Sequence, residues 1–169
     1  MESPPAIIVV CGLPGVGKSR VARLLADRLS ASLYRTDVVR KELVDDPEYT
    51  SEETRRVYDT IRERARRTVA GGGRAILDGT YRAREFRSDL VETAGDLGAD
   101  LQFLHVECEE EVVRERIAKR TDGVSDAAFD QYLLLKSKFE GFERPHATVD
   151  NSGAWDRTRE RVLDTFPDA

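Results

Sequence analysis

The sequence has few cysteines, no long apolar run and no excess of basic residues, and each of these features excludes a class of protein. Its two cysteines, Cys11 and Cys108, are too few for a disulfide framework or a zinc ligand set. The longest apolar run, Ala6–Cys11, is far shorter than the roughly 20 residues of a membrane-spanning helix. The formal net charge of −5 argues against a broad surface that coats nucleic acid.

The chain has the length and composition of one globular domain. Of its 169 residues, 40% are hydrophobic and 35% are charged, so we treat residues 1–169 as a single unit. The first residues include the acidic Glu2 and no basic stretch, which predicts that there is no signal peptide. We therefore expect a cytoplasmic protein without a membrane partner, present as a monomer or a small homo-oligomer.

Short apolar stretches rich in β-branched residues alternate with amphipathic stretches along the chain. This alternation predicts an α/β fold with right-handed crossovers and a parallel sheet. Thr50 and Glu53 have the spacing of a capping box at the start of a long helix. We expect strands at residues 6–11, 32–35, 74–77, 101–108 and 147–150, and helices at residues 18–30, 37–44, 50–70, 83–97, 109–120, 126–140 and 155–165.

Two of these helices carry further expectations. The helix at residues 50–70 is rich in arginine, but the acid-first pairs Glu52–Arg56 and Glu63–Arg67 predict a solvated, salt-bridged face rather than a basic patch. The helix at residues 126–140 is expected to bury Phe129, Tyr132, Leu133 and Phe139.

A glycine-rich motif stands between the first expected strand and the first expected helix. Such a strand, loop and helix arrangement is what gives the pattern G-x-x-x-x-G-K-[ST] its meaning, and a chance glycine-rich turn would not have both flanks right. Every required position of the pattern is matched by Gly12, Leu13, Pro14, Gly15, Val16, Gly17, Lys18 and Ser19.

The motif predicts a site for a nucleoside triphosphate. Its glycines let successive backbone N–H groups point inward and form an anion site at the positive end of a helix. Lys18 is expected to reach the β- and γ-phosphates, and the Ser19 hydroxyl is expected to coordinate Mg²⁺. The chain contains no N-K-x-D, the signature with which switch-type GTPases read guanine, so ATP is the preferred nucleotide.

Beyond this loop, the chain resembles the nucleotide-kinase-like branch of the P-loop proteins. It is most similar to the small ATP-dependent kinases grouped with chloramphenicol phosphotransferase, zeta toxins and the 5′-kinase domain of polynucleotide kinase. The resemblance implies a three-layer α/β/α P-loop NTP hydrolase fold, with a five-stranded parallel sheet in the order 2-3-1-4-5 and a short helical lid at about residues 114–128. It rests on the phosphate loop and on the segments 35–41 (RTDVVRK), 76–80 (ILDGT), 114–120 (RERIAKR) and 149–152 (VDNS).

Asp37 and Arg40 match the Asp-x-x-Arg of that branch. Asp37 follows the second strand, so it should lie at the carboxyl edge of the sheet beside the phosphate loop. There it would orient the acceptor hydroxyl as a catalytic group, and Arg40 would bind a substrate phosphate or the moving phosphoryl group. The alternative is an N-cap aspartate with an exposed arginine one helical turn later.

Asp78 and two arginines complete the expected site. Asp78 ends the third strand and is the candidate Walker-B carboxylate that holds Mg²⁺ through a water, the alternative being a turn-forming aspartate before Gly79. By similarity, Arg116 would stack on the adenine and Arg120 would contact the phosphates when the lid closes. Surface arginines on an acidic helix are the plain alternative for that pair.

These residues predict a kinase that transfers the γ-phosphate of ATP to a hydroxyl group of a small molecule. A second hypothesis is a 5′-hydroxyl polynucleotide or nucleoside kinase, which would hold the end of a nucleic-acid strand in a local basic pocket. A third is a non-catalytic ATP-binding switch protein, which the joint presence of Asp37, Asp78 and the lid arginines disfavours.

Overall fold

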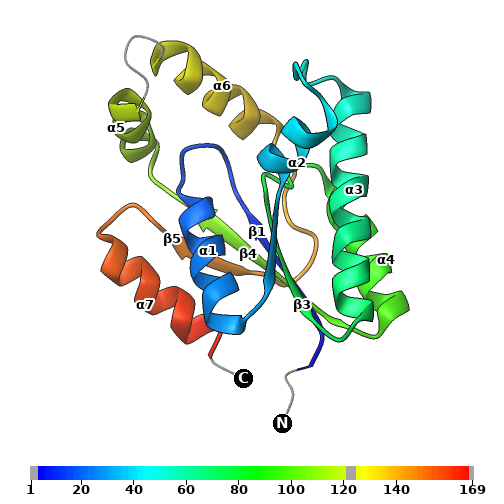
Figure 1. Ribbon diagram of the computed structural model, residues 1–169. Helices are drawn as coiled ribbons and strands as arrows, with labels where there is room; N and C mark the ends of the chain where they lie inside the picture. The colour runs from blue at the N-terminus through cyan, green and yellow to red at the C-terminus, as the bar shows by residue number, and fades with distance from the viewer. Residues whose placement is uncertain (1–3, 121–124, 168–169) are drawn as a thin grey trace.

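The computed structural model describes residues 4–120 and 125–167, which form one α/β unit around a parallel sheet (Figure 1). The strands are β1 (Ala6–Cys11), β2 (Ser32–Arg35), β3 (Arg74–Gly79), β4 (Asp100–Glu107) and β5 (Ala147–Asp150). The helices are α1 (Lys18–Leu29), α2 (Thr36–Leu43), α3 (Ser51–Ala70), α4 (Arg84–Leu97), α5 (Glu110–Arg120), α6 (Ser125–Lys138) and α7 (Trp155–Thr165). The strand order is β2-β3-β1-β4-β5, so the order implied by the resemblance is confirmed.

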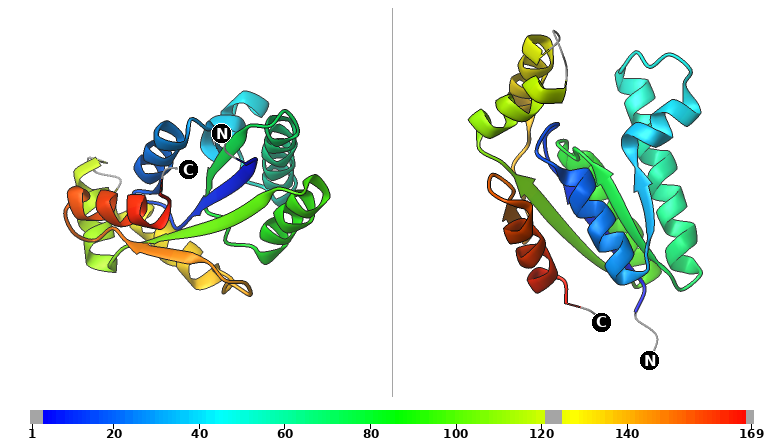
Figure 2. Two further views of the ribbon diagram at one scale, coloured as in Figure 1. Left: turned by 90° about the horizontal axis from the view of Figure 1, so that it is seen from below. Right: turned by 60° about the vertical axis from the view of Figure 1, so that its left-hand side comes forward.

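The central strand β1 is covered on both faces, as its uninterrupted apolar sequence requires. Its odd-numbered residues Ile7 and Val9 pack in a core with α3 and α4, and its even-numbered residues Ile8 and Val10 pack in a second core with α1 and α7. Both further views in Figure 2 show these helix layers on opposite sides of the sheet. Because every strand is parallel, the carboxyl ends of all of them meet at one edge, where the phosphate loop lies (Figure 1).

Strand β3 is longer than the sequence indicated. Its pairing with β1 continues to the register pair of Cys11 and Gly79, two residues beyond the expected end at residue 77. Asp78 is therefore a strand residue, opposite Val10 in β1 and Arg35 in β2, and the interpretation as a turn-forming aspartate is wrong. An acidic residue is tolerated in this strand because its Oδ2 accepts hydrogen bonds from the Ser19 hydroxyl and the Arg35 guanidinium.

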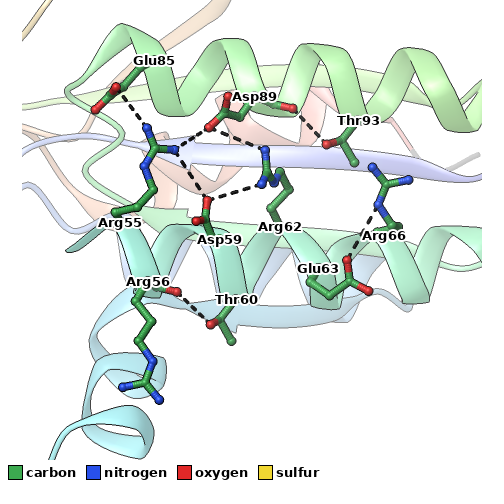
Figure 3. A network of polar contacts seen from close by, with 10 residues as sticks. All are labelled: Arg55, Arg56, Asp59, Thr60, Arg62, Glu63, Arg66, Glu85, Asp89 and Thr93. Carbon is green, nitrogen blue, oxygen red and sulfur yellow. Dashed lines mark hydrogen bonds and ion pairs between the residues drawn. The ribbon is translucent and has the colours of Figure 1, made fainter. Parts of the chain in front are cut away.

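Helix α3 begins with the expected cap. The Thr50 hydroxyl accepts a hydrogen bond from the Glu53 backbone N–H at 3.1 Å, and the Glu53 carboxylate accepts one from the Tyr49 N–H. The Glu63–Arg67 ion pair forms at 3.4 Å. No ion pair joins Glu52 and Arg56 in the described part of the chain, and Arg56 is an exposed side chain (Figure 3).

Two other arginines of α3, Arg55 and Arg62, pair with acidic residues of α4 instead (Figure 3). Arg55 bonds to Asp89 of α4 at 2.8 Å and to Glu85 at 3.1 Å, and Arg62 lies 3.6 Å from Asp89. The face is therefore salt-bridged as expected, but pairs between helices contribute to it as well as pairs at helical spacing.

Helix α6 is less buried than its sequence indicated. Tyr132 is almost fully buried and Phe129 is partly buried, whereas Leu133 is 37% exposed, so the prediction for Leu133 is wrong. The helix projects from the carboxyl edge of the sheet beside α5, which leaves one side of it uncovered (Figure 1). Within residues 4–120 and 125–167, no helix has both the length and the apolar character needed to cross a membrane.

Candidate active site

The phosphate loop adopts a conformation that only glycine accommodates at its two ends. Gly17 has φ 89°, and a Cβ there would collide with the amide of Asn151. A Cβ on Gly12 would lie 2.7 Å from the carbonyl oxygen of Val106 in β4. The glycines of the motif therefore let the loop lie flat against the ends of β4 and β5.

Asn151 fixes the loop from the opposite end of the chain. Its side-chain amide donates to the Val16 carbonyl at 2.8 Å, and its Oδ1 accepts from the Thr158 hydroxyl of α7 at 2.8 Å. Its backbone N–H donates to the Glu107 carbonyl at 2.7 Å, and the residue is 6% exposed. A buried amide with each of these groups paired holds the loop in one conformation.

Ser19 and Asp78, the two expected Mg²⁺ residues, are in direct contact. The Ser19 hydroxyl donates to Asp78 Oδ2 at 2.9 Å, and Asp78 is only 3% exposed. Hydroxyl and carboxylate oxygens are the hard donors that Mg²⁺ prefers, and the rest of its coordination in such sites comes from phosphates and water. A guanidinium also lies against both donors, which shows that this position favours a cation. The donor set therefore fits the magnesium ion predicted from the sequence.

That guanidinium belongs to Arg35, the last residue of β2. It donates to Asp78 Oδ2 at 3.1 Å, to Ser19 Oγ at 3.0 Å and to Asp37 Oδ2 at 3.2 Å. Arg35 thus joins the proposed metal residues to the proposed acceptor residue. Sequence reasoning assigned it no role, and the signal that could have found it is its place at the carboxyl end of a strand, two residues before Asp37.

Lys18 lies inside the loop with its ammonium 3.4 Å from the Leu13 carbonyl. Burial lowers the pKa of this ammonium, and the nearby carboxylates of Asp78 and Asp37 oppose that shift. A lysine that is partly desolvated and lies within the loop can contact the oxygens of a bound phosphate.

Asp37 lies at the same edge with its carboxylate 62% exposed. The N-cap of α2 is Arg35, so the interpretation of Asp37 as an N-cap is wrong, although its Oδ1 accepts from the next backbone N–H at 2.9 Å. Its second oxygen faces Arg35. An exposed carboxylate beside the phosphate loop is accessible to the hydroxyl of a bound acceptor.

Arg40 is largely buried and has polar partners. It is 8% exposed, its guanidinium lies 3.4 Å from the Glu53 carboxylate and 4.6 Å from the centre of the Tyr49 ring, and it donates to the Thr54 hydroxyl at 3.3 Å. In this structure Arg40 holds α2 against the start of α3. A role in binding a phosphate remains a prediction, and it would require these contacts to be exchanged.

The two lid arginines differ in their surroundings. Arg116 donates to the Asn151 carbonyl at 2.6 Å and to the Cys108 sulfur at 3.4 Å, which places it beside the phosphate loop. Arg120, one turn later at the end of α5, is exposed and has no polar partner among the described residues. We expected a loop at residues 121–125. Residues 121–124 lie outside the described residues, and Ser125 is the first residue of α6.

A pocket of about 410 Å³ lies between the phosphate loop and the helices of the expected lid. Its walls come from Leu13 and Val16 of the loop, from the end of β4, and from Tyr132 and Lys136 of α6. Lys136 closes one side through an ion pair with Glu110 of α5 at 3.2 Å. The carboxyl edge of the sheet is therefore hollow beside the phosphate loop.

A family model and several known proteins are similar to this chain. A family model described as AAA domain matches residues 7–141. An uncharacterized protein of Mycobacterium tuberculosis is 27% identical over 164 residues, which cover 90% of this chain and 33% of the relative. The chain thus spans about a third of the length of the curated relatives it matches.

Among solved structures, a sugar kinase from Janibacter sp. HTCC2649 is similar with a TM-score of 0.76 and 21% identity, over 98% of this chain and 96% of the other. A gluconokinase from Sinorhizobium meliloti 1021 has a TM-score of 0.73 and 22% identity, over 97% and 92% of the two chains. The Mycobacterium tuberculosis APS kinase CysC, in complex with AMPPNP and APS, has a TM-score of 0.68 and 17% identity, over 95% and 96%. The fold is that of these kinases.

Proposed function

We propose, from the premise that this chain belongs to the AAA domain family of P-loop NTPases, that it is an ATP-dependent kinase acting on a hydroxyl group of a small molecule. The observation that carries the proposal is the convergence of the Ser19–Asp78 pair, Lys18 and the exposed Asp37 at one edge of the sheet. A switch protein that only binds nucleotide does not transfer phosphate, so it does not require an exposed carboxylate that could accept the proton of an acceptor hydroxyl.

Each of these residues has a separate role in the proposed transfer. Lys18 and the backbone N–H groups of the loop bind the phosphates of ATP, and Ser19 with Asp78 would hold Mg²⁺. When bound, this ion supplies positive charge that neutralises the phosphate oxygens. Asp37 accepts the proton of the acceptor hydroxyl while that oxygen attacks the γ-phosphorus, and ADP leaves. As the lid closes, Arg116 approaches the adenine of ATP and Arg120 approaches its phosphates.

The names of the similar structures, which refer to a sugar, to gluconate and to APS, support a proposal for the kind of acceptor. We infer a small polar molecule with an accessible hydroxyl. A nucleic-acid 5′ end is the second candidate. Arg40, which we expect to bind a substrate phosphate or the moving phosphoryl group, would have to exchange its contact with Glu53 for either acceptor.

The test is transfer of radioactive γ-phosphate from ATP in separate reactions with sugars, sugar acids, APS, nucleosides and an oligonucleotide with a 5′-hydroxyl. We expect a labelled product with one small-molecule class and none with Lys18→Ala, which loses phosphate binding while the fold remains intact. Transfer only to the oligonucleotide would replace the first proposal by the second. ATP binding without transfer in any reaction would favour the switch protein.

A further inference from the structure

Arg35 has a position that neither the phosphate loop motif nor the proposed reaction explains. Its side chain is 22% exposed and reaches from the end of β2 to Ser19 in α1 and Asp78 in β3. These are the two residues to which we assign Mg²⁺. The guanidinium is within 3.1 Å of an oxygen of each, so it occupies the space beside both donors.

A divalent ion and this guanidinium exclude each other there. Mg²⁺ binds oxygen at about 2.0–2.1 Å, so an ion coordinated by Ser19 would lie within a few ångströms of the Arg35 nitrogens that now contact the same oxygen. Two cations at such a distance repel strongly, because the nearly buried Asp78 side chain marks a region where water screens charge poorly. One of them must leave before the other can bind.

The nearly buried carboxylate explains why a cation is present at all. Among the described residues, the side-chain hydrogen bonds of Asp78 come from the Ser19 hydroxyl and the Arg35 guanidinium. An unpaired carboxylate at 3% exposure would be costly, and Arg35 removes that cost in the protein without nucleotide. The contact to the exposed Asp37 needs neither Ser19 nor Asp78, so Arg35 can keep this partner when it leaves the other two.

We propose that Arg35 is a positioning residue that takes the place of the metal ion in the nucleotide-free protein, so that a divalent ion enters only together with the phosphates of a nucleotide. The phosphates bring the additional negative charge that favours the divalent ion over the single charge of the guanidinium. This inference rests on the proposed function only for the assignment of Ser19 and Asp78 to the metal.

The experiment measures binding of Mn²⁺, which accepts the same oxygen ligands as Mg²⁺, to the nucleotide-free protein through the paramagnetic resonance signal of the free ion. Arg35→Gln keeps the length and some hydrogen bonding but removes the charge. We expect its Mn²⁺ affinity to exceed that of the wild type about tenfold or more. Arg35→Met fills the same space, and either folded variant serves.

Two comparisons separate displacement from a general effect of charge. Lys41→Met removes one positive charge from an exposed position on α2, outside the metal and phosphate residues, so we expect its affinity to stay within about threefold of the wild type. Combining Arg35→Gln with Asp78→Asn should abolish the gain. An equal gain in Lys41→Met, no gain in either Arg35 variant, or a gain that survives Asp78→Asn would overturn the inference.

The measurement contains neither ATP nor an acceptor. The Mn²⁺ affinities would therefore be the same whether or not phosphotransfer to any acceptor is found. Conversely, a protein with kinase activity could still show no gain in Mn²⁺ affinity in the Arg35 variants.

Discussion

Asp37 is the residue on which the proposed chemistry depends most directly. Its carboxylate is exposed, lies at the carboxyl edge of the sheet and has Arg35 as its charged partner. A carboxylate at this position can accept a proton from the hydroxyl of a bound acceptor. Geometry and charge at this residue thus agree with a base that meets the acceptor.

We expect Asp37→Asn to retain ATP binding and to lower kcat on the order of 10²-fold or more, because the amide cannot accept the proton. Steady-state kinetics with the best acceptor and a separate binding measurement for ATP give the two quantities. Glu42→Gln, on the same helix α2 and paired with Arg64, is the matched control and should leave both unchanged. Unaltered kcat in Asp37→Asn would reduce Asp37 to a partner of Arg35.

His105, near the end of β4, predicts a dependence of stability on pH. Its ring centre lies 5.1 Å from those of Phe139 and Phe142, and burial among them, together with His146 and Arg87, lowers its pKa to about 4. The Glu107 carboxylate at 3.4 Å favours the charged ring, but it is 55% exposed and does not offset the burial.

The folded pKa of His105 lies below the unfolded value of 6.5, so the unfolded chain binds more protons between these two values. The contribution of neutral His105 to the free energy of unfolding should therefore be complete near neutral pH. It should decrease by at most roughly 3 kcal/mol as the pH falls from 6.5 to 4. Urea unfolding of the wild type and of His105→Phe at several pH values isolates this effect. A slope that persists in His105→Phe would assign it to other groups.

At the scale of elements, Arg87 joins α4 to the segment that follows α6. It is 1% exposed and donates to the carbonyls of Tyr81 at 2.6 Å, Glu140 at 2.9 Å and Gly141 at 2.8 Å. The loop after β3 and the end of α6 are therefore fixed to one another.

Arg87→Met should leave those carbonyls unpaired and lower the free energy of unfolding by about 2–4 kcal/mol. Arg84→Met is the matched control, because both arginines pair with Glu143, Arg87 at 3.3 Å and Arg84 at 3.1 Å, but Arg84 is 55% exposed. We expect less than about 1 kcal/mol for the control. Equal losses for the two variants in urea unfolding would contradict a special role of the buried arginine.

The end of α5 carries two arginines that should differ in the kind of effect. Arg116 already lies beside the phosphate loop, so Arg116→Ala should raise the KM for ATP and narrow the preference for ATP over GTP. Arg120 is exposed, and if it meets charge that develops during transfer, Arg120→Ala should lower kcat much more than ATP affinity. Lys119→Ala, between them in sequence, serves as the control. Kinetics that are negligibly altered in both variants would leave α5 an ordinary surface helix.

For the whole molecule, the site draws on both ends of the chain. Asn151, after the last strand, holds the phosphate loop that follows the first, and Gly12 donates to the Thr80 carbonyl after β3 at 3.3 Å. A nucleotide bound by this loop contacts groups that come together only in the folded protein, so it must stabilise the fold as a whole.

We expect AMPPNP with Mg²⁺ at about 100 times its dissociation constant to raise the free energy of unfolding by about 2.7 kcal/mol, a shift in Tm of roughly 5–11 °C for a chain of this size. Thermal unfolding followed by circular dichroism measures the shift, which Lys18→Ala should abolish. A GTP analogue at the same concentration should shift Tm less. No shift at millimolar AMPPNP would contradict a nucleotide site.

The sequence by itself determined the features that depend on neighbouring residues. The phosphate loop, the alternation of strands and helices and the Thr50 cap are each written in short stretches, because backbone geometry repeats every two or 3.6 residues and loops need glycine at fixed places. The strand order came from resemblance, since crossover rules leave several orders open for the same alternation.

Only the tertiary structure decided which polar groups meet. Ser19 and Asp78 are 59 positions apart and Asn151 and Val16 are 135 apart, so no periodicity relates them. Arg40 looked available for a phosphate, yet the fold brings Glu53 to it, and Arg35 had no assigned role until β2 placed it between Asp37 and Asp78. A long flexible side chain takes the partner that burial and opposite charge offer, and that choice is made by packing.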